Sequence, residues 1–249
     1  MTQPEAKPAT DPSEAKPQVY LATPCYNNTV NSAHVETIYY ASKQGLLKQK
    51  MAPSFSILTH TFNLAYAHAL TSRAKGITHF CMLHDDIVPM EFFWLDKMMA
   101  LMKANGADIL SVVSPIKDDK GLTSTALDLP LPGSLFDPAY RLTRLTMSEI
   151  YNDYPPTFTH EKLLVNSGLM LVDITKPFAD KICFRFENRI EFNKVTQQYD
   201  ALVMSEDWLF SRDAAKLGAK IFATREVPIY HCGGAKFPNT HVWGEWDKD

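Results

Sequence analysis

Apolar segments with the composition of buried strands alternate with segments of helical periodicity through the first half of the chain. Predicted strands cover residues 19–23, 54–58, 77–83 and 107–113. Predicted helices begin at Asn31 or Ser32 and cover residues 62–75 and 89–104. This alternation predicts a mostly parallel α/β sheet with helices on both faces. In such sheets, ligands bind outside the carboxyl ends of the strands.

The composition argues against several classes of protein. The 249 residues carry a net charge of −3, without the basic stripe that marks nucleic-acid binding. No apolar run approaches the ~18–20 residues of a membrane span, and no signal-peptide pattern opens the chain. The cysteines are far apart and form no CxxC pair, so neither a zinc ribbon nor a disulfide framework is indicated. A cytoplasmic protein is the simplest expectation.

The first residues differ in composition from the rest. Residues 1–17 are rich in Pro, Ala, Lys and Glu and lack large apolar side chains. Such a segment cannot offset the entropy lost on ordering, so we expect a disordered tail. Residues 18–249 contain no internal repeat and no Gly/Ser linker, and we expect them to form a single domain.

Two adjacent acids follow the third predicted strand, in the segment "THFCMLHDDIVPMEFFW" (78–94). Two ionised carboxylates at the mouth of a core repel each other, so one must hold a proton or a cation must lie between them. Mg²⁺ or Mn²⁺ suits this position, because such ions take one or two carboxylates together with substrate phosphates. A plainer reading is that Asp86 helps to cap the helix predicted from Pro89.

Two later motifs are ambiguous when taken alone. Glu206 and Asp207 stand in the first turn of a predicted helix behind Ser205, where acids are common for structural reasons. His231 follows a segment that resembles a strand and precedes Gly233 and Gly234, where the backbone can approach a phosphate closely.

Taken in order, these motifs resemble those of the nucleotide-sugar glycosyltransferases of the GT-A fold, and most closely the family 2-like group. The resemblance covers about residues 18–234 and rests on "ATPCYN" (22–27), "FNLAYAHALTSRAKGITHFCMLHDDIVP" (62–89), "NSGLMLVD" (166–173), "SEDWLFSRDAAKLG" (205–218) and "YHCGG" (230–234). It implies a Rossmann-like GT-A domain that transfers a sugar from a nucleotide-diphosphate donor to an acceptor hydroxyl.

The resemblance also implies roles for individual residues. The metal, Mn²⁺ or Mg²⁺, is expected on Asp86, Asp85 and His231. The donor nucleotide is expected to contact Thr23, Pro24, Tyr26, Asn27, Asn63, His84 and Asp85. The sugar and acceptor are expected to contact Asn166, Ser167, Gly168 and Trp208. The general base is expected to be Asp207, with Glu206 beside it. One position departs from the family, because His84 stands where the first acid of the D-x-D motif is usual.

Two other functions remain open. A sugar nucleotidyltransferase usually carries a Gly-rich, basic loop after its first strand, but "TPCYNNTVNS" (23–32) contains no Gly, Lys or Arg. A catalytically inactive nucleotide- or carbohydrate-binding module is the second alternative. His84 in place of an acid favours it, whereas Glu206 and Asp207 argue against it, since a binder needs no base.

Several features of the reaction are left undetermined by these motifs. The resemblance favours a UDP-sugar as the donor, and a GDP-sugar as the second choice. The acceptor and the stereochemistry are undetermined, and the irregular segment 130–160 is where we expect acceptor contacts. Trp243 and Trp246 could stack on sugar or base, or simply pack as part of the C-terminal segment.

Overall fold

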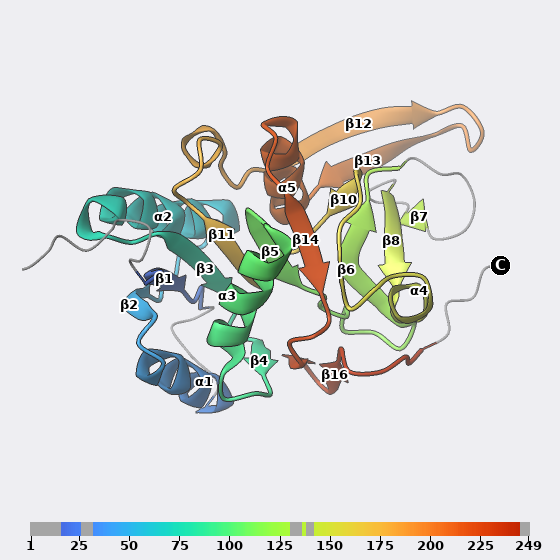
Figure 1. Cartoon of the computed structure of the whole chain (residues 1–249). Coiled ribbons are helices and arrows are strands. Elements are labelled where there is room, and N and C mark those ends of the chain that lie inside the picture. Colours follow the sequence, from blue (N-terminus) through green and yellow to red (C-terminus); the bar gives the residue numbers. More distant parts are fainter. Residues whose placement is uncertain (1–15, 26–31, 130–135, 138–141, 245–249) are drawn as a thin grey trace, which may run out of the picture.

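The structure, a computed structural model, describes residues 16–25, 32–129, 136–137 and 142–244 (Figure 1). Most of the predicted tail, residues 1–17, lies outside these ranges. None of the helices in the described ranges is both long enough and apolar enough to span a bilayer.

A seven-stranded sheet forms the centre of the molecule, in the order β2-β1-β3-β11-β5-β14-β9. Its strands are β1 (Val19–Ala22), β2 (Leu47–Met51), β3 (His79–Leu83), β5 (Ile109–Val112), β9 (Thr157–Phe158), β11 (Leu169–Asp173) and β14 (Ile221–Thr224). β1 is parallel to β2 and β3, and β5 is parallel to β14. β11 is antiparallel to its neighbours β3 and β5, and β9 is antiparallel to β14. The predicted mixed α/β class with a mostly parallel sheet is confirmed.

Helices cover both faces of this sheet, as the alternation of sequence patterns predicts (Figure 1). Helices α1 (Ser32–Lys43) and α3 (Trp94–Asn105) pack on the face that carries Val19 and Leu21 of β1. Helices α2 (Leu58–Thr71) and α5 (Glu206–Lys216) pack on the other face, with Tyr20 and Ala22. Successive residues of β1 alternate between the two cores because side chains of a strand point to opposite faces.

The prediction of a second strand at residues 54–58 is wrong, because no strand forms there. The strand that pairs with β1 is β2, whose side chains are half exposed at the edge of the sheet. Phe55 and Ile57 are 53% and 66% exposed, so these apolar residues are not part of a buried strand. Helix α2 begins at Leu58, four residues before the predicted start at 62.

The helix predicted from Pro89 also begins elsewhere. Pro89 ends a short strand, β4 (Ile87–Pro89), and α3 starts only at Trp94. β4 pairs with the distant strand β15 (Ile229–Cys232), a partner that a local pattern does not reveal. Asp86 therefore does not cap a helix, and the plainer reading of the acidic pair is wrong.

The other strands of the described residues form three smaller sheets. A four-stranded sheet consists of β10 (Leu163–Leu164), β6 (Leu122–Leu127), β8 (Leu142–Thr146) and β7 (Phe136–Asp137). β16 (Lys236–Pro238) pairs with β15, which in turn pairs with β4, so these strands form a three-stranded sheet. Strands β12 (Glu187–Asn193) and β13 (Gln198–Met204) form a separate hairpin. Helix α4 (Met147–Asn152) and the 3-10 turns η2 (Ser72–Lys75) and η3 (Ala179–Lys181) complete the elements.

Candidate functional site

Several loops meet where β3 and β5 end and β11 begins. The His84 backbone N–H donates to the Gly168 carbonyl at 2.8 Å, which joins the end of β3 to the start of β11. The Cys232 N–H donates to the Asp86 carbonyl at 2.7 Å, which joins β15 to the same loop. These bonds place residues 84–86, 166–168 and 231 at the carboxyl edge of the sheet. The sequence predicts this position for residues 84–86.

Asp86 and His231 lie in direct contact at this edge. His231 Nε2 is 3.3 Å from Asp86 Oδ2, and His231 Nδ1 is 2.6 Å from the carbonyl oxygen of Pro115. A carbonyl only accepts hydrogen bonds, so Nδ1 must carry a proton. In a neutral ring Nε2 then presents a lone pair to the carboxylate. The contact is favourable only with a proton or another cation between the two groups.

Lys117 completes this cluster, and sequence reasoning missed it. It follows β5, and its ammonium donates to Asp86 Oδ2. Burial acts to raise the pKa of Asp86, but the hydrogen bonds from His231 and Lys117 hold that pKa well below its usual value. The rule that ligands bind at carboxyl strand ends could have identified Lys117, because β5 ends at the same edge.

One oxygen of the cluster has no partner. Asp86 Oδ1 is buried and makes no hydrogen bond within the described residues. A buried acceptor without a partner carries a desolvation penalty that a ligand or cation would relieve. One carboxylate and one imidazole nitrogen would supply two ligands to a divalent ion. Across the described ranges, however, no group of three or more His, Cys, Asp or Glu side chains is placed to hold a metal.

Asp85 and His84 point to different neighbours. Burial raises the pKa of Cys25 and lowers that of His34, and the negative charge of Asp85 acts to raise both pKa values, which places Asp85 near the end of β1 and near α1. The ring of His84 packs 5.1 Å from that of Phe62, and its Nε2 is 3.3 Å from Ser167 Oγ. Burial lowers the pKa of His84 to about 4, against the opposing effect of Asp86, so the ring is neutral at pH 7.

The predicted donor-binding residues at the end of β1 are only partly described. Thr23 is buried and its N–H donates to the Met51 carbonyl, so it continues the pairing of β1 with β2. Pro24 follows it, and Tyr26 and Asn27 lie outside the described residues.

Asn63 is held by the backbone of a distant residue. Its Nδ2 donates to the Phe184 carbonyl at 2.7 Å, and its Oδ1 accepts from the Phe184 N–H at 2.8 Å. This two-way pairing connects α2 to the segment before β12. The amide group therefore already has a structural task.

Residues 166–168 form a tight kink before β11. Asn166 is 3% exposed, and its side chain joins the Val112 carbonyl to the Gly168 N–H. A Cβ at Gly168 would lie 3.1 Å from Asn166 Oδ1 and 3.3 Å from Ile87 Cγ1, so only glycine fits without a shift. Ser167 Oγ meets the ring of His84, so the kink packs directly against the acidic loop.

Glu206 and Asp207 begin α5 behind Ser205, as predicted. Burial, and then the neighbouring charge of Asp207, raise the pKa of Glu206 to about 7. Burial also raises the pKa of Asp207, although hydrogen bonds from Ser205 Oγ and the Trp208 N–H, the latter at 2.8 Å, favour its charged form. The two adjacent acids therefore retain protons near neutral pH more readily than exposed acids do.

The tryptophans expected near substrate are engaged in packing. Trp208 is 2% exposed, its Nε1 donates to the Ser124 carbonyl at 2.9 Å, and Arg144 lies over its ring. Trp243 Nε1 donates to the Pro238 carbonyl at 2.8 Å, and its ring lies 5.5 Å from that of Phe237. Trp246 and most of residues 130–141 lie outside the described residues.

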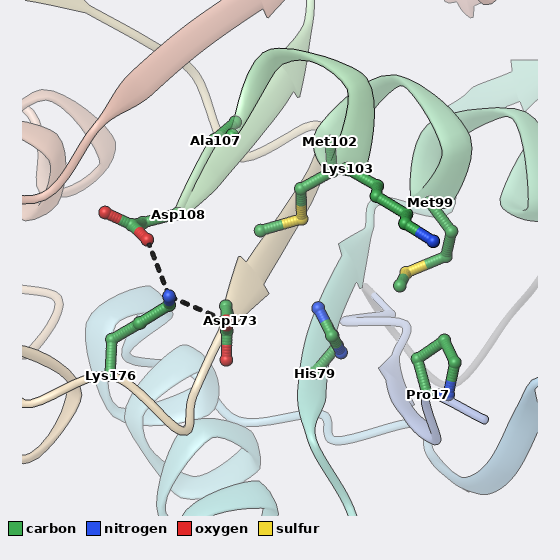
Figure 2. A pocket seen from close by; sticks show the side chains of 10 residues that line it. Pro17, His79, Met99, Met102, Lys103, Ala107, Asp108, Asp173 and Lys176 are labelled. Carbon is green, nitrogen blue, oxygen red and sulfur yellow. Dashed lines mark ion pairs between the residues drawn. The ribbon is translucent and has the colours of Figure 1, made fainter. Parts of the chain in front are cut away.

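A cavity of about 330 Å³ lies at the opposite end of the sheet, where β3 begins and β11 ends (Figure 2). Lys176 Nζ lies 3.4 Å from Asp108 Oδ1 and 3.7 Å from Asp173 Oδ2, so the lysine already forms ion pairs with both carboxylates. The apolar part of the wall includes Met99 and Met102. This cavity shares no residue with the loops around Asp86.

Comparisons with known proteins do not assign a family. No protein-family model matches the sequence, and no curated protein matches it. Among solved structures, the chain is similar to A197 from STIV, with 15% identity, a TM-score of 0.48, and coverage of 87% of this chain and 86% of that chain. It is also similar to a nucleoside-diphosphate-sugar pyrophosphorylase from Vibrio cholerae RC9, with 10% identity, a TM-score of 0.33, and coverage of 83% and 72%. At TM-scores below 0.5 neither likeness establishes a shared function.

Proposed function

We propose that the chain is a GT-A-type glycosyltransferase that moves a sugar from a nucleotide-diphosphate donor, first of all a UDP-sugar, to an acceptor hydroxyl. The observation that carries the proposal is the cluster of Asp86, His231 and Lys117 at the carboxyl ends of the strands. Within it Asp86 Oδ1 is buried and has no hydrogen-bond partner among the described residues, while the Lys117 ammonium is paired with Asp86 Oδ2. A diphosphate together with a divalent cation would satisfy both groups.

In this proposal Asp86 and His231 hold Mn²⁺ or Mg²⁺, with Asp85 close by in the same loop. The bound ion would neutralise charge on the departing nucleoside diphosphate, the Lewis-acid role of such metals. Lys117 would leave Asp86 and pair with a phosphate oxygen instead. His84, neutral and held by Ser167, would form one wall of the site beside the donor.

Asp207 is our choice for the general base that takes the acceptor hydroxyl proton. Its Oδ1 is fixed by Ser205 and by the Trp208 N–H, so the carboxylate has a defined orientation. A base within hydrogen-bond reach typically contributes 10²–10⁴-fold to the rate. The neighbouring Glu206, with a pKa of about 7, would govern how much of the pair is charged.

The kink at residues 166–168 would connect the two halves of the site. Ser167 contacts His84, and the Val165 N–H is 3.3 Å from Ser211 Oγ on α5. Direct contacts therefore connect the loop of Asp86 with the helix of Asp207. We expect the sugar to lie along these contacts.

Calorimetric titration with UDP, with and without Mn²⁺, tests the proposal. We expect Mn²⁺-dependent binding that disappears in Asp86→Ala. An Asp207→Asn variant should keep UDP binding and lose transfer by ~10²-fold or more. UDP binding that ignores both the metal and Asp86 would contradict the proposed site.

The product distinguishes the main alternatives. Incubation with a UDP-sugar and a mixture of acceptors should release UDP in a glycosyltransferase. Incubation with UTP and a sugar 1-phosphate should release pyrophosphate in a nucleotidyltransferase. Metal-dependent UDP binding with neither product would indicate a binding module.

A further inference from the structure

The hairpin of β12 and β13 projects from the body of the molecule (Figure 1). Its two seven-residue strands pair along their whole length, from Glu187 opposite Met204 to Asn193 opposite Gln198. β13 is the inner strand, because Leu202 is 5% exposed and Met204 packs against the cluster that includes Trp208. In the described part of the chain, β12 pairs with β13 alone.

The outer strand combines a free edge with an exposed apolar face. Ile190 is 75% exposed and Phe192 is 46% exposed. Tyr199, opposite Phe192 on β13, is 74% exposed, and the two rings lie 5.2 Å apart. Side chains of alternate residues share a face, so Ile190, Phe192 and Tyr199 form one apolar surface. An exposed edge strand presents a row of unpaired backbone N–H and C=O groups, which is a template for pairing with another strand.

The other face of β12 carries alternating charges. Glu187, Arg189 and Glu191 follow one another on this face, and Arg189 Nε is 2.9 Å from Glu191 Oε1. In an antiparallel pair of identical strands, directly opposite residues are related by a two-fold axis. The position of that axis decides which charges face each other.

Only an axis at Ile190 pairs the whole strand with its copy. Ile190 is the middle residue of Glu187–Asn193, so each of the seven residues gains a partner. In this register Arg189 faces Glu191 of the second copy, and Glu191 faces its Arg189. An axis at Arg189 would instead place Glu187 opposite Glu191, and an axis at Glu191 would place two copies of Glu191 opposite each other. Like charges directly opposite are destabilising, whereas opposite charges stabilise the pair.

We propose that the chain dimerises through β12, which pairs antiparallel with β12 of a second copy around Ile190 to form a continuous four-stranded sheet. The backbone N–H and C=O groups of the two β12 strands form hydrogen bonds with each other. The exposed apolar faces of the two hairpins then form one continuous surface. The hairpin ends at Met204, directly before Ser205 and the acids of α5.

Sedimentation velocity of the full chain, over a range of concentrations, tests this pairing. The parent protein should sediment as a dimer. Arg189→Glu should weaken the dimer about tenfold or more, because two cross-strand attractions become repulsions. Ile190→Lys should do the same by placing two ammonium groups opposite each other. Val195→Lys, at the hairpin tip outside the paired residues and 93% exposed, should leave the dimer unchanged.

Charge exchange separates pairing from damage to the hairpin. The double variant R189E/E191R should recover the dimer, since the charges are again complementary. The single variants R189E and E191R should each be monomeric alone and form a mixed dimer when combined. A monomeric parent protein, or a dimer that survives both Ile190→Lys and Arg189→Glu, overturns the proposal.

Discussion

His231 Nε2 lies 3.3 Å from Asp86 Oδ2, although the two residues are 145 positions apart in the sequence. The pairing of β15 with β4 brings them together, and the Pro115 carbonyl fixes which ring nitrogen carries the proton. Nε2 then faces the carboxylate, so the contact is favourable only when a proton on Nε2 or another cation lies between the two groups. Lys117 supplies one cation, and a divalent metal is the other candidate.

Lys117→Met tests the competition between these two cations. The substitution removes the ammonium but keeps most of the side-chain volume. A partly exposed ion pair is worth ~0.2–1 kcal/mol, so Mn²⁺ affinity should rise by up to about fivefold once Lys117 no longer holds Asp86. Affinity for UDP in the presence of Mn²⁺ should fall, because a phosphate contact is lost.

Titration calorimetry with Mn²⁺ alone, and then with UDP, measures both effects. Asp86→Asn is the matched control and should abolish Mn²⁺ binding. Weaker Mn²⁺ binding in Lys117→Met would show that Lys117 does not compete with the metal for Asp86.

Gly233→Ala should disturb the ion pair between Lys117 and Asp86 by displacing the lysine side chain. A Cβ at position 233 would lie 2.9 Å from Lys117 Cδ, so the lysine stem must move. We expect Mn²⁺ affinity to change in the direction of Lys117→Met, while the free energy of unfolding falls by less than about 1 kcal/mol. Gly234→Ala is the control, because a Cβ there meets nothing within 4 Å. Equal behaviour of the two variants in Mn²⁺ titration would contradict the prediction.

Glu206 should make stability depend on pH. Its pKa rises from 4.5 to about 7 on folding, so the folded state binds the proton more tightly than the unfolded state. This contribution is fully present below about pH 4.5 and is lost as the pH rises through 7, by at most about 3 kcal/mol. Glu206→Gln should therefore raise the melting temperature relative to the parent protein at pH 8, with a smaller difference at pH 5.

Thermal unfolding across this pH range measures the effect. Glu161→Gln, which alters an exposed acid, should leave the profile unchanged. A Glu206→Gln profile parallel to that of the parent protein would mean that Glu206 titrates as an ordinary surface acid.

Asn63→Ala separates a structural role from a donor-binding role. The variant loses both hydrogen bonds to the Phe184 backbone and leaves those backbone groups without their partner. The free energy of unfolding should fall by ~1–3 kcal/mol, as expected for such groups. The dissociation constant for UDP with Mn²⁺ should stay unchanged. Chemical denaturation and calorimetry report the two quantities, and a large loss of UDP affinity with normal stability would restore the donor-binding role.

The sequence by itself determined the class of fold and where in it the candidate residues 84–86, 206 and 207 fall. Buried strands and amphipathic helices leave a periodic pattern, because burial depends on which face of an element a residue occupies. The end of β3 could thus be located, and with it residues 84–86. The helix α5, with Glu206 and Asp207 in its first turn, was predicted on the same grounds.

Only the tertiary structure decided which side chains meet. Asp86 contacts His231 because β4 pairs with β15, and Pro89 became part of that pairing instead of a helix. The bond between Asn63 and Phe184 and the ion pair of Lys117 join segments that no periodicity relates. A periodic pattern in the sequence indicates whether a residue is buried. It does not indicate which distant segment packs against that residue, and the contact depends on that segment.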